Sequence, residues 1–551
     1  MTQWWLDVNK IIPGRQKSLR DLMAEAVTTG LGGDKSKCVT VTPDRFKKLY
    51  LDRVENLRDW CLSRQIWWGH RIPIWYRDRL KVKSLSSTAI GDEKLKVEDR
   101  VREMIISETK PEGEGWVQDE DTLDTWFSSG AWTFSTLGWP DKTEDLKKYH
   151  PTTWMQMGYE ILFFWMARMI LLTTYALDDI PFKDVYIHGI LRDKNGKKFS
   201  KSLGNGLDPL QIIEKYGTDA LRLSLLKGIT PGNDSRFYEE KIEGARNFVN
   251  KLWNISRYIL QSVGKIKLIE KSPVLPNPRF AESRRGGEPK AKTLADKWIL
   301  AKLNSVINSA TQELDKYNFS TASDILYEFT WNDFADWYLE IAKIEGAKDE
   351  ILLYTLQSLL KLWHPFCPFI TEEIWKNLDD KDLLMISEWP KHNKIKDKGE
   401  EFELIKEIIS VIRNLRSENK IKPVKIINIT IISQENRKLI EEQKEIIKKL
   451  ARAELEILEK GDKPENSIGA IVGGIEIYIS LAGIVDIEAE KKRLQKEITE
   501  AEKYIKSIEL KLANKDFASR APEAVINGET EKMKITRDKL EKLNQQLNNL
   551  K

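Results

Sequence analysis

The stretch of sequence that decides the fold is IHGILRDKNGKKFSKSLGNGLDPLQIIEKYGTDALRLSLL, residues 187–226. It overlaps a mostly apolar run, DVYIHGIL (184–191), which is bounded by polar residues and predicts a buried strand. The last part of the quoted stretch, PLQIIEKYGTDALRLSLL (209–226), predicts two helices with Gly217 between them. Because strands that alternate with helices build α/β sheets, we expect residues 1–235 to form an α/β domain.

Between the strand and the helices lies a loop that is rich in lysine, serine and glycine. Its centre is KKFSKS (197–202), and LGNGLDP follows. Such a loop brings positive charge to phosphates, which suits chemistry in which pyrophosphate leaves a nucleoside triphosphate. A solvated surface loop can have the same composition, so the motif taken alone leaves both interpretations open.

Length and composition limit the classes of protein to consider. A chain of 551 residues is too long for one hydrophobic core, and about two to four domains are expected. The net charge is only +4, so any nucleic-acid-binding face must be local. The three cysteines are far apart in sequence, which argues against a zinc knuckle or disulfide framework and favours a cytoplasmic location. The most apolar segment, 161–172, contains Arg168 and is too short to span a membrane.

The rest of the chain divides by pattern into four further regions. Residues 236–292 are predicted to form stem helices and a linker that is rich in proline, glycine and charged residues. Helical spacing continues through 293–422 and predicts a bundle. Residues 423–485 read as a small α/β region, with strands at 425–433 and 475–482 and a helix between them.

The last region, 486–551, carries a heptad pattern in two stretches. Pro522 and Gly528 lie between the stretches and favour a reversal of chain direction. Only Lys491 breaks the apolar seam, so the pattern predicts an antiparallel coiled coil. The seam residues are Ile487, Leu494, Ile498, Ala501, Ile505, Ile508 and Leu512, then Met533, Leu540, Leu543, Leu547 and Leu550.

Residues 187–226 resemble the signature loop of the class I aminoacyl-tRNA synthetases, with Phe199 where that family usually has methionine. Two more segments, NLRDWCLSRQIWWGHRIPIWY (56–76) and DEDTLDTWFSSGAWTFSTLGWP (119–140), are similar to the valyl branch rather than the isoleucyl one. The resemblance covers essentially the whole chain. It implies an incomplete Rossmann-like catalytic domain, an all-α anticodon-binding bundle, a small α/β junction and a coiled-coil tRNA-binding arm.

The resemblance also implies roles for single residues. Lys198 and Lys201 would be catalytic, and Lys201 would contact ATP together with His188, Gly189 and Ser200. Trp68 and Trp126 would wall the amino-acid pocket, where a flat aromatic ring suits a branched aliphatic side chain. A tryptophan is also an ordinary core residue, and that reading stays open. Glu160 stands where the family usually has aspartate, and we assign it no role.

The tRNA partner would meet basic residues in two places. These are Arg413 and Arg416 on one helix face, and Lys491, Lys492 and Arg493 on the C-terminal arm. A solvated helix face is the alternative for each arginine. Magnesium would arrive with ATP, so neither a dedicated metal site nor a structural zinc is expected. The implied substrates are valine, ATP and tRNA(Val), with no membrane partner.

One expected motif is missing from the sequence. The family carries a His-x-Gly-His signature, and none of the five histidines lies in one. The resemblance begins in mid-domain at QWWLDVNK (3–10). We therefore expect valine–tRNA ligase activity only when the N-terminal half is supplied, for instance by a separate chain, and little from this chain alone. A non-catalytic tRNA-binding module and an isoleucyl-type enzyme are the alternatives.

Overall fold

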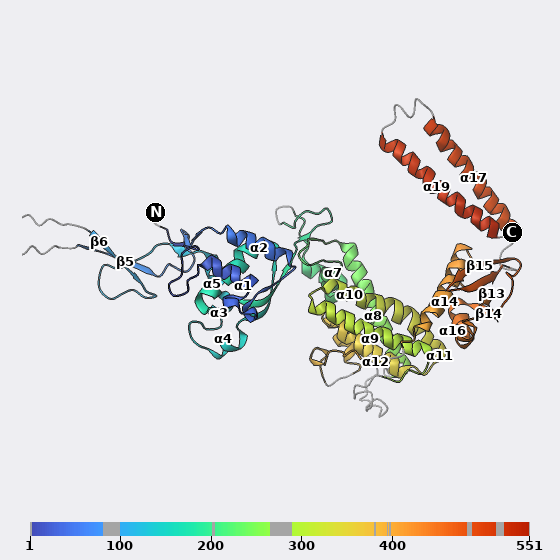
Figure 1. Ribbon diagram of the computed structural model, residues 1–551, viewed down its shortest axis with the longest axis horizontal. Coiled ribbons are helices and arrows are strands. Elements are labelled where there is room, and N and C mark those ends of the chain that lie inside the picture. Colours follow the sequence, from blue (N-terminus) through green and yellow to red (C-terminus); the bar gives the residue numbers. More distant parts are fainter. Residues whose placement is uncertain are drawn as a thin grey trace, which may run out of the picture. The chain divides into compact units, whose positions relative to one another are not determined.

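The chain folds into two compact units, and each is described by itself (Figure 1). The computed structural model describes residues 3–80, 100–200, 204–264, 289–378, 382–393, 395, 398–481, 487–513 and 523–549. The first unit contains residues 1–246 together with 312–322, and the second contains 247–311 and 323–551.

The centre of the first unit is a three-stranded parallel sheet. Its order is β2 (Thr40–Thr42), β10 (Phe182–His188) and β9 (Thr152–Gly158). In the middle strand Val185 and Ile187 are fully buried on one face, and Tyr186 is buried on the other. The strand that the sequence predicts at 184–191 is therefore confirmed, and it ends at His188.

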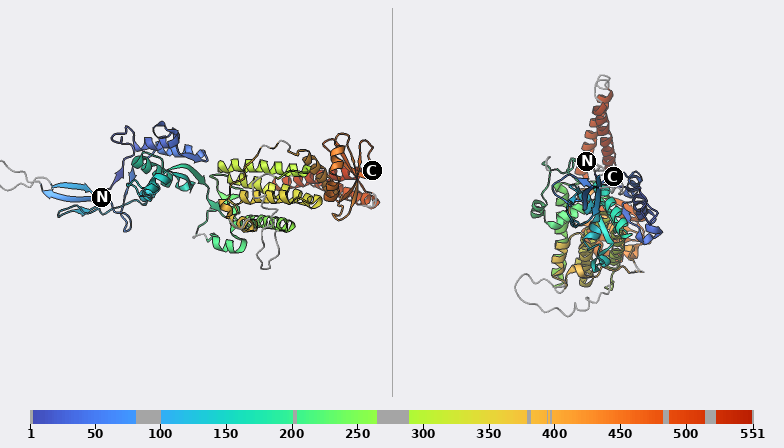
Figure 2. Two further views of the ribbon diagram at one scale, coloured as in Figure 1. Left: turned by 90° about the horizontal axis from the view of Figure 1, so that it is seen from below. Right: turned by 90° about the vertical axis from the view of Figure 1, so that its left-hand side faces the viewer.

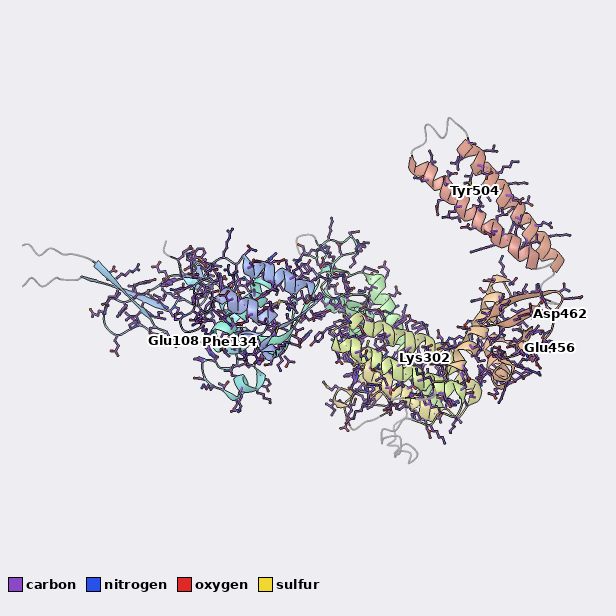
Figure 3. All side chains as sticks on the ribbon, in the orientation of Figure 1. Glu108, Phe134, Lys302, Glu456, Asp462 and Tyr504 are labelled. Carbon is purple, nitrogen blue, oxygen red and sulfur yellow. The ribbon has the colours of Figure 1, made fainter. Side chains whose placement is uncertain are left out.

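Helices surround this sheet and complete its core. The helices are α1 (Leu19–Thr28), α2 (Arg45–Glu55), α3 (Thr125–Ser135), α4 (Glu144–Tyr149), α5 (Ala167–Leu177), α6 (Pro209–Tyr216) and α7 (Thr218–Leu226). A capping box at Ser18 and Asp21 begins α1. Phe134 of α3, labelled in Figure 3, is buried in the core where α3 packs on α5. Gly217, with φ of 90°, separates α6 from α7, which confirms the predicted break.

Short antiparallel strands form small sheets beside this core. The pairs are β1 (Trp5–Leu6) with β3 (Trp60–Cys61) and β4 (Ser63–Arg64) with β8 (Thr122–Leu123), and β5 (Ile74–Leu80) lies between β6 (Arg100–Ile106) and β7 (Val117–Gln118). In the last sheet Arg77 pairs with Glu103 at 2.8 Å and lies over the ring of Trp116. These contacts order a part of the chain that has little apolar core.

The most apolar segment of the chain is longer than the sequence indicates. Residues Tyr159–Leu177 form 19 continuous helical residues with a mean hydropathy of 1.4, which is long and apolar enough to cross a membrane. Half of its most apolar stretch is buried, and Met166, Met169 and Ile170 are fully buried in the core of the first unit. Within this unit the segment is a core helix.

The second unit begins with a helical bundle, as the sequence predicts. Figure 2 shows its long helices side by side. The elements are α8 (Glu239–Ser262), α9 (Leu294–Asp315), α10 (Phe319–Glu328), a π-helical turn (Phe329–Tyr338), α11 (Leu339–Glu345), α12 (Asp349–Trp363), α13 (Pro368–Trp375) and α14 (Glu401–Glu418). The start of α8 (239–246) and the facing ends of α9 and α10 (312–322) belong to the first unit. Trp298, Phe334 and Trp363 are fully buried among them.

A small α/β sheet follows, with the order β14-β13-β16-β15. The elements are β13 (Ile427–Ile432), α15 (Arg437–Glu442), α16 (Lys444–Ala451), β14 (Ala453–Leu458), β15 (Ser467–Val472) and β16 (Ile475–Ser480). The two strands that the sequence predicts are present. The strands β14 and β15 were not predicted. For β14 the reason is that AELEIL (453–458) continues the Lys/Glu-rich pattern of the preceding helix.

The chain ends in two long helices that lie side by side, α17 (Ile487–Ala513) and α19 (Glu523–Asn549) (Figures 1 and 2). Leu494, Ile498 and Leu543 are buried between them. Arg537 pairs with Glu509 across the two helices at 2.7 Å. Tyr504, labelled in Figure 3, lies on α17 and is half exposed. Gly528 lies within α19 rather than in the predicted turn, and Pro522 lies outside the described residues.

Candidate functional site

The ends of two parallel strands provide the frame of the candidate site. His188 at the end of β10 is paired with Gly158 at the end of β9. In parallel sheets, ligands bind in the crevice beyond the carboxyl ends of the strands. Gly189 is required here, because a Cβ atom would lie 2.0 Å from the carbonyl oxygen of Asn233. The missing side chain lets the loop at 233–234 cross the end of β10.

A cavity of about 660 Å³ opens beside these strand ends. It contains three of the residues that the resemblance assigns to ATP and its chemistry, His188, Gly189 and Lys198, together with Glu160. The full lining is Trp154, Gln156, Glu160, Tyr186, His188, Gly189, Ile190, Leu191, Lys198, Phe199, Leu225, Leu226, Ile229, Asn233, Ser235 and Phe319. A volume of this size is typical of small-molecule and cofactor sites.

Hydrogen bonds fix the stem of the lysine loop. Asp193 accepts from the backbone N–H groups of Asn195 and Lys197 at 2.9 and 2.8 Å. Asn205 donates to Asp193 at 3.0 Å and accepts from the N–H of Ser200 at 2.9 Å, so it ties the two sides of the loop together. The Asn205 amide and these backbone donors hold the pKa of Asp193 below its usual value. The sequence analysis did not predict a role for Asn205. Its place in the glycine-rich segment LGNG, directly after the lysine loop, is the one feature that marks it.

A second carboxylate supports the base of the loop. Asp234 accepts from the backbone N–H of Ile190 at 2.8 Å, from Arg192 and from the hydroxyl of Tyr159. Burial would raise the pKa of Asp234, but these hydrogen bonds lower it overall, so the group is ionised. This network holds the residues that follow His188 in one orientation.

The lysines themselves differ in what the structure shows. Lys198 lines the cavity, and among the described residues its ammonium group has no ion pair. Lys201 lies outside the described residues, and its role in ATP chemistry stays a prediction. Ser200 lies at the edge of the described loop.

Trp68 and Trp126 do not come together as walls of a pocket. Trp68 is 85% exposed and does not line the cavity beside the ends of β9 and β10. The loop that carries Trp68 is anchored beside β8, since the N–H of Leu123 donates to the carbonyl of His70 at 2.7 Å. Trp126 is half-buried and stacks on Phe164, with ring centres 5.9 Å apart. The described residues do not bring the two rings together, and their role as walls of the amino-acid pocket stays a prediction.

A second cavity lies near Trp126 in the same unit. Its volume is about 560 Å³, and Trp60, Arg64, Phe163 and Arg168 are among its lining residues. Arg168 lies over the ring of Trp60 at 4.6 Å, and burial lowers its pKa. This arrangement places a half-buried cation beside the rings of Trp60, Trp126 and Phe164.

Arg416 does not meet phosphates in this fold. It is only 6% exposed, and its guanidinium donates to five backbone carbonyls at 2.7–3.2 Å. Those oxygens belong to Ala451, Arg452, Lys422, Pro423 and Lys425. Arg416 therefore joins the end of α14 to the small α/β sheet, an arrangement that does not support its predicted role in tRNA binding.

Arg413 has a related but weaker structural role. Its Nε and Nη2 donate to the carbonyl of Leu450 at 3.2 and 3.0 Å, near the end of α16. Its guanidinium also lies 5.0 Å from the ring centre of Trp337, and burial lowers its pKa. The helix face that the sequence offers to tRNA is thus largely used within the protein.

The basic residues of the C-terminal arm are more accessible. Lys492 is exposed, and Arg493 pairs with Glu497 one turn along the same helix. The side chain of Lys491 lies outside the described residues. Exposed lysines on a helix can neutralise phosphates without selecting a base sequence.

Comparison with known proteins gives the family. A model described as "tRNA synthetases class I (I, L, M and V)" matches residues 1–237. Models for the "Anticodon-binding domain of tRNA ligase" and the "Valyl tRNA synthetase tRNA binding arm" match 296–431 and 486–551. The three matches follow the order of the regions that the sequence predicts.

Three bacterial relatives with the same name illustrate the similarity. The chain is 43% identical to a valine–tRNA ligase of Clostridium tetani, over 94% of this chain and 57% of that protein. It is 39% identical to that of Carboxydothermus hydrogenoformans, over 94% and 56%, and 40% identical to that of Bacillus subtilis, over 91% and 55%. The chain thus spans little more than half the length of these curated relatives. It belongs to the class I aminoacyl-tRNA synthetase family, in the branch of the valine–tRNA ligases.

Proposed function

We propose that this chain carries the ATP-handling and tRNA-binding parts of a valine–tRNA ligase. The observation that carries the proposal is the cavity at the ends of β9 and β10, which gathers His188, Gly189 and Lys198 beside the stem of the lysine loop. The names of the relatives support the same activity. Their names also favour valine over isoleucine as the amino acid.

The proposed reaction has two steps. The carboxylate of valine attacks the α-phosphate of ATP, and pyrophosphate leaves as valyl-adenylate forms. A hydroxyl of the terminal tRNA ribose then attacks the valyl carbonyl, and AMP leaves. Negative charge moves to the leaving pyrophosphate in the first step, and a lysine fixed beside it stabilises the transition state.

The residues of this chain supply orientation and positive charge in that scheme. Gly189 lets the backbone at 233–234 pack against the end of β10, which shapes the cavity beside His188. Lys198 is fixed by the Asp193–Asn205 bonds at the stem of its loop. Magnesium enters with ATP as part of the substrate. Among the described residues there is no group of three or more His, Cys, Asp or Glu that could hold a metal.

The tRNA-binding part of the proposal rests on the bundle and the C-terminal arm. The arm is the better candidate for contact with tRNA phosphates. Arg413 and Arg416 donate hydrogen bonds within the protein, whereas Lys492 of the arm is exposed. The anticodon would meet other residues of the bundle. We also propose tRNA(Val) as the partner, in line with the names of the relatives.

Exchange of labelled pyrophosphate into ATP tests the proposed activity. The chain is mixed with a polypeptide that supplies the part of a relative that this chain does not span. Exchange should depend on valine, and isoleucine should support it poorly. Exchange that prefers isoleucine would move the chain to the isoleucyl branch. Retained tRNA binding without exchange would make it a tRNA-binding module.

A further inference from the structure

A short turn that belongs by sequence to the helical bundle lies in the first unit. Residues 312–322 contain the turn between α9 and α10, and they fold with residues 1–246 rather than with the rest of the bundle. Phe319 of this turn lines the candidate ATP cavity. The turn falls within the stretch that matches the anticodon-binding domain, yet Phe319 lines the cavity at the ends of β9 and β10.

Aromatic side chains seat the turn on the parallel sheet. The ring of Phe319 lies 5.5 Å from that of Tyr186 of β10, and the ring of Tyr317 lies 6.0 Å from that of Trp154 of β9. Ser320 accepts from the backbone N–H of Gly228 at 2.8 Å, which ties the turn to the loop after α7. The same turn is therefore held by two strands and a loop of the cavity.

The backbone of the turn is in an unusual conformation. Tyr317 has φ of 60°, which a tyrosine adopts at an energetic cost. Two bonds within the turn maintain it, since Tyr317 N–H donates to Leu314 O at 2.9 Å and Asn318 N–H to Glu313 O at 2.8 Å. A cost of this kind persists only where surrounding contacts fix the conformation.

The cavity changes from apolar to polar along the strands. Tyr186 and His188 are two residues apart, so they lie on one face of β10 about 7 Å from each other. Tyr186 contacts Phe319, whereas His188 lies at the strand end with Gly158. Trp154, Leu226 and Ile229 add apolar lining, and Lys198 adds a positive charge. A base suits the aromatic part, and phosphates suit the lysine.

We propose that Phe319 is a positioning residue of the ATP site, whose ring forms part of the wall against which the adenine base packs. This inference rests on the proposed function. Under this proposal, the α9–α10 turn, which lies in the sequence of the helical bundle, takes part in nucleotide binding. Stacking and apolar contact would favour a nucleotide over a bare polyphosphate, while the lysine loop recognises both.

Two ligands separate the base from the phosphates in a binding test. ATP and inorganic tripolyphosphate are titrated calorimetrically into the full 551-residue chain and its variants. For Phe319→Ala we expect ATP affinity to fall about tenfold, the usual scale for removing one aromatic ring from a base, with tripolyphosphate affinity unchanged. Phe319→Leu should retain part of the affinity for ATP. Tyr238→Ala, which removes an exposed ring outside the cavity lining, should bind both ligands as the parent does.

Each other outcome has a definite meaning. Unchanged ATP affinity in Phe319→Ala would overturn the inference while leaving the ATP cavity in place. Equal weakening of both ligands, accompanied by a lower Tm, would make Phe319 a structural residue and would also overturn it. If the parent chain binds neither ligand even when the complementary polypeptide of the pyrophosphate-exchange assay is present, the cavity is not an ATP site and the proposed function fails with the inference. Lys198→Ala checks the cavity separately, because it should weaken both ligands.

Discussion

The lysine loop and the end of α14 both carry basic residues that the sequence offers to phosphates, but the fold uses them differently. Lys198 lines a cavity, and among the described residues its ammonium group has no ion pair. Arg416 is buried and donates to five carbonyl oxygens. A basic residue is available to a ligand only where the fold does not itself supply acceptors.

The acceptors in these two regions have different sources. Around Lys198 the nearby acceptors are already used, because Asp193 takes backbone and Asn205 donors, and Asp234 takes Ile190 and Arg192. Around Arg416, carbonyl oxygens from two chain segments converge, and the two terminal nitrogens of one guanidinium donate to five of them. Converging backbone carbonyls thus occupy the donors of an arginine. Carboxylates that accept from other donors, by contrast, leave a nearby lysine available to a ligand.

The largest expected effect lies in the lysine loop. In the mixed preparation that exchanges pyrophosphate, Lys201→Ala and Lys198→Ala should each lower the rate of adenylate formation about 100-fold, the usual cost of removing one preorganised donor to a transition state. Valine affinity should change much less. Lys194→Ala removes an exposed lysine of the same loop outside the cavity lining, and its rate should stay near that of the parent. A normal rate in Lys201→Ala would show that the loop does not act on ATP.

The next largest effect is on the stability of the fold around Arg416. Arg416→Ala should lower the free energy of unfolding by about 3 kcal/mol, because buried carbonyls lose a charged donor. Arg413→Ala is the matched control and should cost about 1 kcal/mol, since it leaves a single carbonyl without its donor. Urea unfolding of the three proteins measures both values.

Binding measurements decide whether either arginine also serves tRNA. Neither variant should alter the salt dependence of tRNA binding under conditions where it remains folded. If Arg416→Ala keeps its stability but flattens the salt dependence, the buried guanidinium reaches phosphate after all, and the contrast with the lysine loop disappears.

The smallest effect concerns the C-terminal arm. Replacing Lys492, Lys503 and Lys506 with glutamine leaves the apolar seam intact and removes three exposed charges. The slope of log binding constant against log salt should decrease by about 0.9 for each phosphate that the arm no longer neutralises. Valine activation should be unchanged, and the apparent KM for tRNA should rise. Truncation after Asp486 should have the same pattern with a larger rise.

A lysine outside the arm provides the control for that measurement. Lys438 of α15 is exposed, and Lys438→Gln should leave the salt slope unchanged. An unchanged slope in the triple variant would make the arm a structural or dimerising element. Equal damage to activation and to charging would indicate a folding defect.

The sequence by itself determined the order of the regions and most of the helices. It placed the strand before the lysine loop, the break at Gly217 and the seam in which Leu494, Ile498 and Ile508 are buried. These features are local, because the spacing of apolar residues within one element records which face that element buries. The same locality made the cavity residues His188, Gly189 and Lys198 identifiable, since they lie within eleven residues around one strand end.

Only the tertiary structure decided what the polar and aromatic residues contact. Arg416 finds acceptors as far away as Arg452, a contact separated by 36 residues that no spacing rule reveals. Trp68 is held in solvent by the loop that carries it, although its motif suggests a pocket. The turn at 312–322 joins the first unit, which its sequence position does not indicate. The physical reason is that periodicity specifies which face is buried, whereas the partner of each buried group depends on segments that are distant in sequence.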